Sequence, residues 1–199
     1  RPFNNRGGHG APRRRSPFSG ASIHPQRFVN KPTGPKPEEA KFVPQHSFAD
    51  FGFVPELLQN LQSKGYVHPT RIQDGAIPHV LRGGDVIGLA NTGSGKTAAF
   101  VLPLIHRMKS MSQRQTALIV APTRELAVQI EDEFKIFAKG LGLFSTLCVG
   151  GVKIGPQKFG LSRHPHMIIG TPGRLKDLVN QGALKLGSVN VLVLDEVDR

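Results

Sequence analysis

An octapeptide at residues 90–97 carries the residues whose types and spacing point most specifically to chemistry. A short apolar run at residues 85–89 precedes it, and residues 96–108 show apolar residues at helical spacing. Strand, glycine-rich turn, Gly-Lys-Thr and helix form the order typical of a phosphate-binding loop, where backbone N–H groups and the helix dipole hold anionic oxygens. Lys96 is expected to reach the β- and γ-phosphates of a nucleotide, and the Thr97 hydroxyl to ligate Mg²⁺. The residues expected to bind the nucleotide here are Ala90, Asn91, Thr92, Gly93, Ser94, Gly95, Lys96 and Thr97.

A pair of acids follows the last apolar run of the sequence, residues 189–194. Asp195 is expected to hold Mg²⁺ through water, and Glu196 to orient and deprotonate an attacking water molecule. Acids at the end of a strand are often only solvated, but a phosphate-binding loop earlier in the chain favours the catalytic interpretation. The expected catalytic residues are therefore Lys96, Asp195 and Glu196, and the expected metal ligands are Thr97 and Asp195.

Two other apolar runs are each followed by a threonine and an arginine at the start of a helical pattern. Threonine is a good helix N-cap, but the helix dipole disfavours an arginine in the first turn, so capping alone does not explain the pattern. On one rim of a sheet, these helix starts would form a line of anion sites suited to a sugar–phosphate backbone. A glycine pair after a third run would allow a phosphate to approach closely. The residues expected to contact this backbone are Pro122, Thr123, Arg124, Gly150, Gly151, Thr171, Pro172, Gly173 and Arg174.

The elements that must position these residues alternate between strands and helices. Apolar, β-branched runs predict strands at residues 85–89, 116–121, 144–149, 166–170 and 189–194. Helical spacing predicts helices at residues 55–64, 70–81, 96–108, 124–138 and 174–180, and at 155–163, where two glycines and a proline weaken the pattern. This alternation predicts an α/β fold with a mostly parallel sheet and helices on both faces. Residues 191–194 are apolar at every position, which favours a central, buried strand. Ligands of such sheets bind at the carboxyl ends of the strands.

The first 45 residues differ in composition from the rest of the chain. They contain nine Lys or Arg residues and two Glu residues, and Gly, Pro, Arg and Asn predominate. Such a segment cannot bury enough apolar surface to offset chain entropy, so we expect a disordered basic tail at 1–45 and a folded domain at 46–199. The formal net charge of +12 suggests a polyanionic partner, with nucleic acid the first candidate. The tail is expected to bind RNA, and an inert solvated leader is the alternative.

Composition also bears on the compartment. Cys148 is the single cysteine, which excludes internal disulfides and fits a reducing environment. No apolar run approaches the roughly 20 residues that a bilayer span needs, and no hydrophobic signal core follows the basic amino terminus. We therefore expect a soluble, intracellular protein, assigned to the cytoplasm, without a membrane partner. The chain begins at Arg1 and ends at Arg199, just after the acids, so we expect it to be a fragment.

Taken in order, the motifs resemble those of the first RecA-like domain of DEAD-box RNA helicases. Residues 65–73, GYVHPTRIQ, resemble the family's Q motif, and Phe48 stands at the expected upstream aromatic position. Residues 122–127, PTRELA, resemble motif Ia, and the phosphate loop, the glycine pair, residues 171–174 and residues 195–198 resemble the remaining motifs. The resemblance implies a RecA-like P-loop NTPase fold with three layers, incomplete at residue 199. It also implies an ATP-dependent RNA helicase that separates or remodels RNA duplexes.

The resemblance implies roles for individual residues as well. Gln73 would hydrogen-bond the adenine edge, and Phe48 and Tyr66 would lie near the base. Asp198 would couple the ATP site to a second RecA-like domain, which would supply an arginine finger from beyond residue 199. The implied cofactors are ATP and Mg²⁺, and the implied partner is RNA. Val197 departs from the alanine of the family motif and leaves the subfamily open.

Two alternatives remain open at this stage. The first alternative to an RNA helicase is a module that anneals or remodels RNA through its tail, with incidental ATP binding. Another phosphate-loop ATPase, such as a DNA helicase or translocase or a nucleotide kinase, is the second alternative. A kinase gives no reason for Gln73 or for the paired threonine and arginine helix starts. Without its second domain, the fragment alone is expected to bind ATP weakly and to hydrolyse it slowly or not at all.

Overall fold

The computed structural model describes residues 42–196 of the chain. Most of the predicted tail, residues 1–41, lies outside the described residues, as do Val197 and Asp198. Contacts begin within the last residues assigned to the tail, because the guanidinium carbon of Arg71 lies 5.4 Å from the centroid of the Phe42 ring. The backbone N–H of Gln45 also donates to Asp74 Oδ2 at 2.8 Å.

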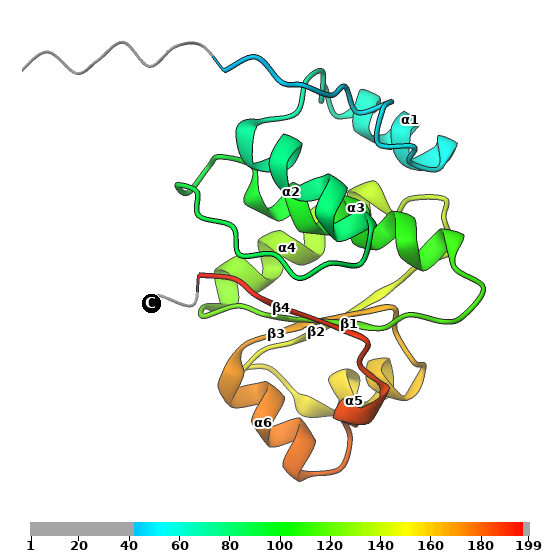
Figure 1. The fold of residues 1–199 in the computed structure, drawn as a ribbon. Coiled ribbons are helices and arrows are strands. Elements are labelled where there is room, and N and C mark those ends of the chain that lie inside the picture. Colours follow the sequence, from blue (N-terminus) through cyan, green and yellow to red (C-terminus); the bar gives the residue numbers. More distant parts are fainter. Residues whose placement is uncertain (1–41, 197–199) are drawn as a thin grey trace, which may run out of the picture. The chain divides into compact units, whose positions relative to one another are not determined.

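Four parallel strands form the sheet (Figure 1). Their order across the sheet is β2-β3-β1-β4. The strands are β1 (Ala117–Val120), β2 (Ser145–Cys148), β3 (Met167–Gly170) and β4 (Val191–Leu194). The predicted parallel sheet is thus confirmed, with each of these strands one or two residues shorter than expected. Because the strands are parallel, their carboxyl ends and the loops that follow them share one rim.

Helices cover both faces of the sheet, as predicted (Figure 1). One face carries α1 (Pro55–Ser63), α2 (Arg71–Leu81), α3 (Lys96–Ser110) and α4 (Arg124–Phe137), and the other carries α5 (Ile154–Ser162) and α6 (Pro172–Asn180). A short 3₁₀ helix, η2 (Leu186–Ser188), precedes β4. Each α-helix corresponds to one predicted from the sequence. Within residues 42–196, no helix is long and apolar enough to span a bilayer.

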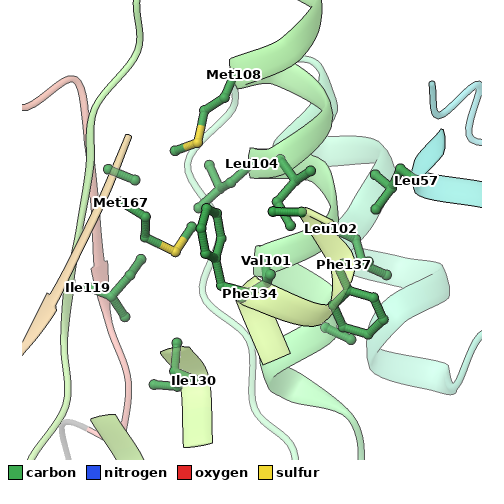
Figure 2. Close-up of a cluster of buried hydrophobic side chains, with 14 of the residues drawn as sticks. Leu57, Val101, Leu102, Leu104, Met108, Ile119, Ile130, Phe134, Phe137 and Met167 are labelled. Atoms are coloured by element: carbon green, nitrogen blue, oxygen red, sulfur yellow. The ribbon is translucent and has the colours of Figure 1, made fainter. Parts of the chain in front are cut away.

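Alternate side chains of the strands supply two separate cores. Ile119 and Met167 are fully buried and point toward Phe134 and the helix α3, as Figure 2 shows. Their sequence neighbours Leu118 and Ile168 face the opposite side and pack with residues of α5 and α6. The two apolar faces fix the sheet between two helical layers, which gives the three-layer arrangement.

The strand predicted at residues 85–89 is wrong for the part of the chain that the structure describes. The segment between α2 and the phosphate loop carries no ladder hydrogen bonds, and Ile87 and Leu89 are 94% and 93% exposed. The β-propensity of an apolar run is expressed only where a neighbouring strand accepts its hydrogen bonds, and no described strand does so here. Within residues 85–89, Gly88 lies close to α2, since an added Cβ there would stand 3.2 Å from Ile72 Cδ1.

The position predicted for the last strand is also wrong. We expected residues 191–194 to form a central, buried strand, but β4 pairs only with β1 and lies at the edge of the described sheet. Leu192 and Leu194 are consequently 58% and 55% exposed. Apolar residues on both faces of a strand indicate that both faces are suited to burial, and they do not determine how many strands flank it.

Candidate functional site

The phosphate-binding loop joins the segment that follows α2 to the start of α3. Gly93 and Gly95 have φ angles of 81° and 87°, a region that side chains other than glycine disfavour. Gly95 is the N-cap of α3 and provides no side-chain cap for the helix N–H groups, so these donors remain available to an anion. The buried Ser94 Oγ has no hydrogen-bond partner among the described residues. Open N–H donors and an unpaired hydroxyl fit a bound triphosphate.

Gln73 is fixed against this loop rather than turned outward. Its side chain is 1% exposed, its Oε1 accepts from the Thr70 backbone N–H at 3.0 Å, and its Nε2 donates to the Gly95 carbonyl at 3.1 Å. Thr70 and Gln73 together form a capping box at the start of α2. One amide hydrogen and one lone pair are left over, because an amide offers two donors and two acceptor sites. The expected contact with adenine stays a prediction.

Asp195 begins the acidic loop directly after β4. Burial raises the pKa of this carboxyl, the positive charge of Lys96 lowers it, and the negative charge of Glu196 raises it. Because the charge of Lys96 acts on Asp195, the start of α3 and the acidic loop lie near each other. A bound divalent cation would favour the ionised carboxylate and reverse the effect of burial. Glu196 adopts a left-handed conformation with φ 50°, which is uncommon for a residue with a side chain.

Phe48 and Tyr66, the two residues expected near a base, lie together. Their ring centroids are 5.9 Å apart in an edge-to-face arrangement, and both line a pocket of about 350 Å³ that also includes Gly65 and Val67. Phe48 is only 6% exposed, so its ring forms part of the pocket wall. Burial is the main cause that raises the pKa of the Tyr66 hydroxyl, and the charge of Glu133 raises it further. The pocket offers an aromatic and apolar surface suited to a flat ring.

The predicted nucleic-acid residues meet around the glycine pair. Thr123 caps α4 as expected, with its Oγ1 accepting from Leu126 N at 3.2 Å. The Arg124 guanidinium lies against Gly151, where an added Cβ would overlap it. Both terminal nitrogens of Arg174 donate to the carbonyl of Val152, at 3.3 and 3.2 Å. The two arginines are thus held on one loop.

Strand order sets the sequence of loops along this rim. The loop after β2 contains Gly150 and Gly151, the loop after β3 leads to Thr171, and the loop after β1 leads to Thr123. These loops follow three adjacent strands, and the fourth strand, β4, ends at Leu194, directly before Asp195. Thr171 does not cap α6 with its side chain, which differs from Thr123, and Pro172 occupies the first turn. The hydroxyl of Thr171 therefore makes no bond to the first turn of α6.

A third carboxyl near the acidic loop was missed by the sequence analysis. The buried Oε2 of Glu133, on α4, has no hydrogen-bond partner among the described residues. Burial raises the pKa of Glu133, the charge of Asp195 raises it further, and Lys64 lowers it. The charge of Glu133 also raises the pKa of Tyr66, so Glu133 lies near both Tyr66 and Asp195. The available signal was its place beside Phe134, at the border of the buried stripe of α4.

Comparisons with known proteins agree with this geometry. The family model described as DEAD/DEAH box helicase matches residues 70–199. The ATP-dependent rRNA helicase RRP3 of Lodderomyces elongisporus is 48% identical over 154 residues, which cover 77% of this chain and 31% of that protein. A putative ATP-dependent RNA helicase of Caenorhabditis elegans is 42% identical over 163 residues, which cover 81% of this chain and 33% of that protein. The chain thus spans about a third of the length of these curated relatives.

A solved structure shows the same fold. The crystal structure of a hypothetical ATP-dependent RNA helicase from Sulfolobus tokodaii has a TM-score of 0.67 and 31% sequence identity to this chain. The match covers 72% of this chain and 41% of that one. The matched family region begins at Thr70, the first residue of the capping box, and includes the phosphate loop, both arginine helix starts and the acidic loop. The chain therefore belongs to the DEAD/DEAH box helicase family.

Proposed function

We propose that the complete protein containing this chain is an ATP-dependent RNA helicase, which hydrolyses ATP to separate or remodel RNA duplexes. The observation that supports this most directly is the order of loops on the carboxyl rim. The acidic loop follows β4 and interacts with Lys96, while Arg124 and Arg174 meet on the loop that follows β2. A site for a triphosphate and a track for a sugar–phosphate backbone would thus share one edge of one sheet.

In the proposed phosphate site, the loop N–H groups and Lys96 hold the phosphates, while Thr97 and Asp195 hold Mg²⁺, Asp195 through water. When bound, Mg²⁺ would neutralise charge on the phosphate oxygens. Glu196 would orient the attacking water and accept its proton. Asp198, outside the described residues, would couple this chemistry to a second RecA-like domain.

Base recognition would fall to the other end of the site. The free hydrogen and lone pair of the Gln73 amide would face the adenine edge, and Phe48 and Tyr66 would provide the neighbouring apolar surface. A paired donor and acceptor on a base edge contributes roughly 1–3 kcal/mol of discrimination in comparable base recognition. The proposed site would therefore prefer ATP to GTP.

The proposed RNA track would run along the arginine helix starts. Arg124 and Arg174 would pair with phosphates, and Thr123, Thr171 and the glycine pair would approach the ribose-phosphate chain. Contacts to 2′-hydroxyl groups would select RNA over DNA. RNA and ATP together would close the second domain over the rim, and that domain would supply an arginine finger worth roughly 10³–10⁵ in rate in related NTPases. The 199-residue chain alone would therefore hydrolyse ATP slowly or not at all.

The variant Lys96→Ala in the full-length protein tests the proposal. It should abolish ATP-dependent unwinding of a short RNA duplex, because the phosphates lose their principal cation. Lys139→Ala removes the same charge from an exposed site after α4 and serves as the control. Unwinding that survives Lys96→Ala would overturn the helicase proposal and favour annealing through the basic tail.

The basic tail favours that second candidate function, an RNA-annealing module, and it has its own test. The affinity for single-stranded RNA should be measured across salt concentrations with and without residues 1–45. Each phosphate contact that is lost should flatten the log–log salt slope by roughly 0.7. An unchanged slope would show that the tail does not contact RNA.

Competition between matched RNA and DNA oligonucleotides distinguishes an RNA helicase from a DNA helicase, and RNA should bind more tightly.

We also propose a cytoplasmic location, which the single cysteine supports because Cys148 is buried as a free thiol.

A further inference from the structure

Asp74 is a buried acid directly after Gln73 that no sequence motif identified. Its side chain is 7% exposed and accepts three hydrogen bonds from the segment before the pocket. Gln45 N donates to Oδ2 at 2.8 Å, His46 N donates to Oδ1 at 3.2 Å, and His46 Nδ1 donates to Oδ1 at 2.7 Å. Burial opposes ionisation of this carboxyl, but the bonds from Gln45 and His46 outweigh it and lower the pKa of Asp74.

These bonds fix the amino side of the turn that carries Phe48. On its other side, the Asp50 carboxylate accepts from the backbone N–H and the hydroxyl of Ser47, at 2.6 and 2.8 Å. The imidazole of His46, 42% exposed, lies 5.5 Å from the Phe51 ring. Phe48 therefore stands between two anchored points, and its ring contacts Phe51 as well as Tyr66.

Gln73 and Asp74 connect this turn to the phosphate loop. The two residues are adjacent in the first turn of α2, and both are buried polar side chains. Gln73 bonds to Gly95 in the phosphate loop, while Asp74 bonds to the backbone of Gln45 and His46. One helical turn thus links the phosphate end of the site to the aromatic end, and the link at the aromatic end depends on Asp74.

We propose that Asp74 and His46 are positioning residues for base recognition, which hold Phe48 at a fixed distance from Gln73 and the phosphate loop. The inference rests on the proposed ATP site and adds residues that set its preference for adenine. Neither residue touches the nucleotide. Their effect is on where the Phe48 ring stands, so they should influence binding of the base and leave binding of the triphosphate unchanged.

The histidine offers a matched pair of variants. His46→Ala removes the Nδ1–H donor, whereas the amide nitrogen of His46→Asn can donate to Asp74 from a similar position. His46 is partly exposed and outside the helices, so both variants should fold. Asp74→Asn is a stronger change, because the amide would turn a donor toward N–H groups of Gln45 or His46 that bond to the carboxylate in the wild type.

The test uses the full-length protein and equilibrium binding of fluorescently labelled ATP and GTP. His46→Ala should weaken ATP binding roughly tenfold, the loss expected for one charge-assisted hydrogen bond, and leave GTP binding unchanged. His46→Asn should restore ATP affinity to near the wild-type value, and Asp74→Asn should resemble or exceed His46→Ala. Equal losses for ATP and GTP, an unchanged ATP affinity in His46→Ala, or no rescue by His46→Asn would each overturn the inference.

Lys96→Ala distinguishes this inference from the proposed function. It should weaken ATP and GTP alike, because it acts on the phosphates. A protein in which Lys96→Ala leaves both affinities unchanged has no phosphate site of the proposed kind, which overturns the function and the inference together. If the protein prefers ATP and loses affinity in Lys96→Ala, but His46→Ala leaves ATP affinity unchanged, the proposed function stands. Only the positioning role is then contradicted.

Discussion

The guanidinium group of Arg124, at the start of α4, lies against Gly151 in the loop after β2. Gly151 has a φ angle of 74°, and a Cβ added there would overlap Arg124 Nη1. The loop that approaches the arginine so closely also accepts two hydrogen bonds from Arg174 through the Val152 carbonyl. Two cations from two different helices are therefore organised by one short segment, and glycine is the residue type that this close approach requires.

Gly151→Ala should displace Arg124 and weaken RNA binding by the full-length protein, roughly tenfold. The backbone strain of a side chain at positive φ is on the order of 1–3 kcal/mol, and the overlap adds to it. Gly155→Ala, in α5 with open space around its α-carbon, is the matched control and should bind RNA normally. RNA affinity should be measured by fluorescence anisotropy. Equal affinities of the two variants for RNA would contradict the proposed role of Gly151.

Gly95→Ala should destabilise the chain more than Gly93→Ala. Both glycines have positive φ angles, so both variants carry backbone strain of similar size. A Cβ added at Gly95 would also overlap the Gln73 amide, whereas a Cβ added at Gly93 would have no other atom within 4 Å. The difference in free energy of unfolding, measured in urea, should therefore be about 1 kcal/mol or more, the usual cost of overpacking. Equal losses would mean that the contact between Gln73 and Gly95 adds nothing.

Glu133→Gln should stabilise the chain at neutral pH and have little effect in acid. The folded-state pKa of this carboxyl is raised, mainly by burial, so ionisation is penalised in the folded protein. This loss of stability is absent below the pKa that Glu133 has in the unfolded chain, and it grows as the pH rises through the higher pKa of the folded chain. Glutamine does not ionise, so the variant avoids the loss. Thermal unfolding at pH 4 and pH 7.5 should show a gain in Tm only at the higher pH. Asp132→Asn, exposed on the same helix, is the control, and a gain that is independent of pH would refute the argument.

Gly160→Ala should destabilise the packing of α5 on β2, and Thr146→Ala should relieve the effect. An added Cβ at Gly160 would stand 2.8 Å from Thr146 Cγ2 and 2.9 Å from Oγ1, and both atoms disappear in the threonine variant. Overpacking of about 1–3 kcal/mol should exceed the gain of up to about 1 kcal/mol from replacing glycine in a helix. A double-mutant cycle by urea unfolding should give a favourable coupling energy of at least about 0.5 kcal/mol, and strict additivity would contradict it.

The sequence predicted the elements well where apolar spacing and burial coincide. The stripe of α4 is an example, because Ile130, Phe134 and Phe137 are spaced for one face and all are buried. Thr123 as the cap of this helix followed from residue type alone. The arrangement of loops on one rim followed from the parallel strands, which the alternation of strands and helices had indicated.

Sequence reasoning failed where a feature depends on partners distant along the chain. Ile87 and Leu89 belong to a run with strand composition, yet no described strand pairs with it. The apolar run at residues 191–194 predicted that Leu192 is buried, but Leu192 is exposed because β4 lies at the edge of the described sheet. The roles of Asp74 and Glu133 arise from contacts across 28 or more residues, which local patterns do not encode.

The most direct test of the shared rim is RNA-stimulated ATP hydrolysis by the full-length protein carrying Arg124→Gln or Arg174→Gln. ATP affinity without RNA should stay at the wild-type value, because neither arginine contacts the proposed phosphate site. RNA stimulation of turnover should fall roughly tenfold or more, as expected when a phosphate-binding cation is lost from the coupled track. If RNA stimulates both variants as strongly as the wild type, the track does not lie along these helix starts and the account is wrong.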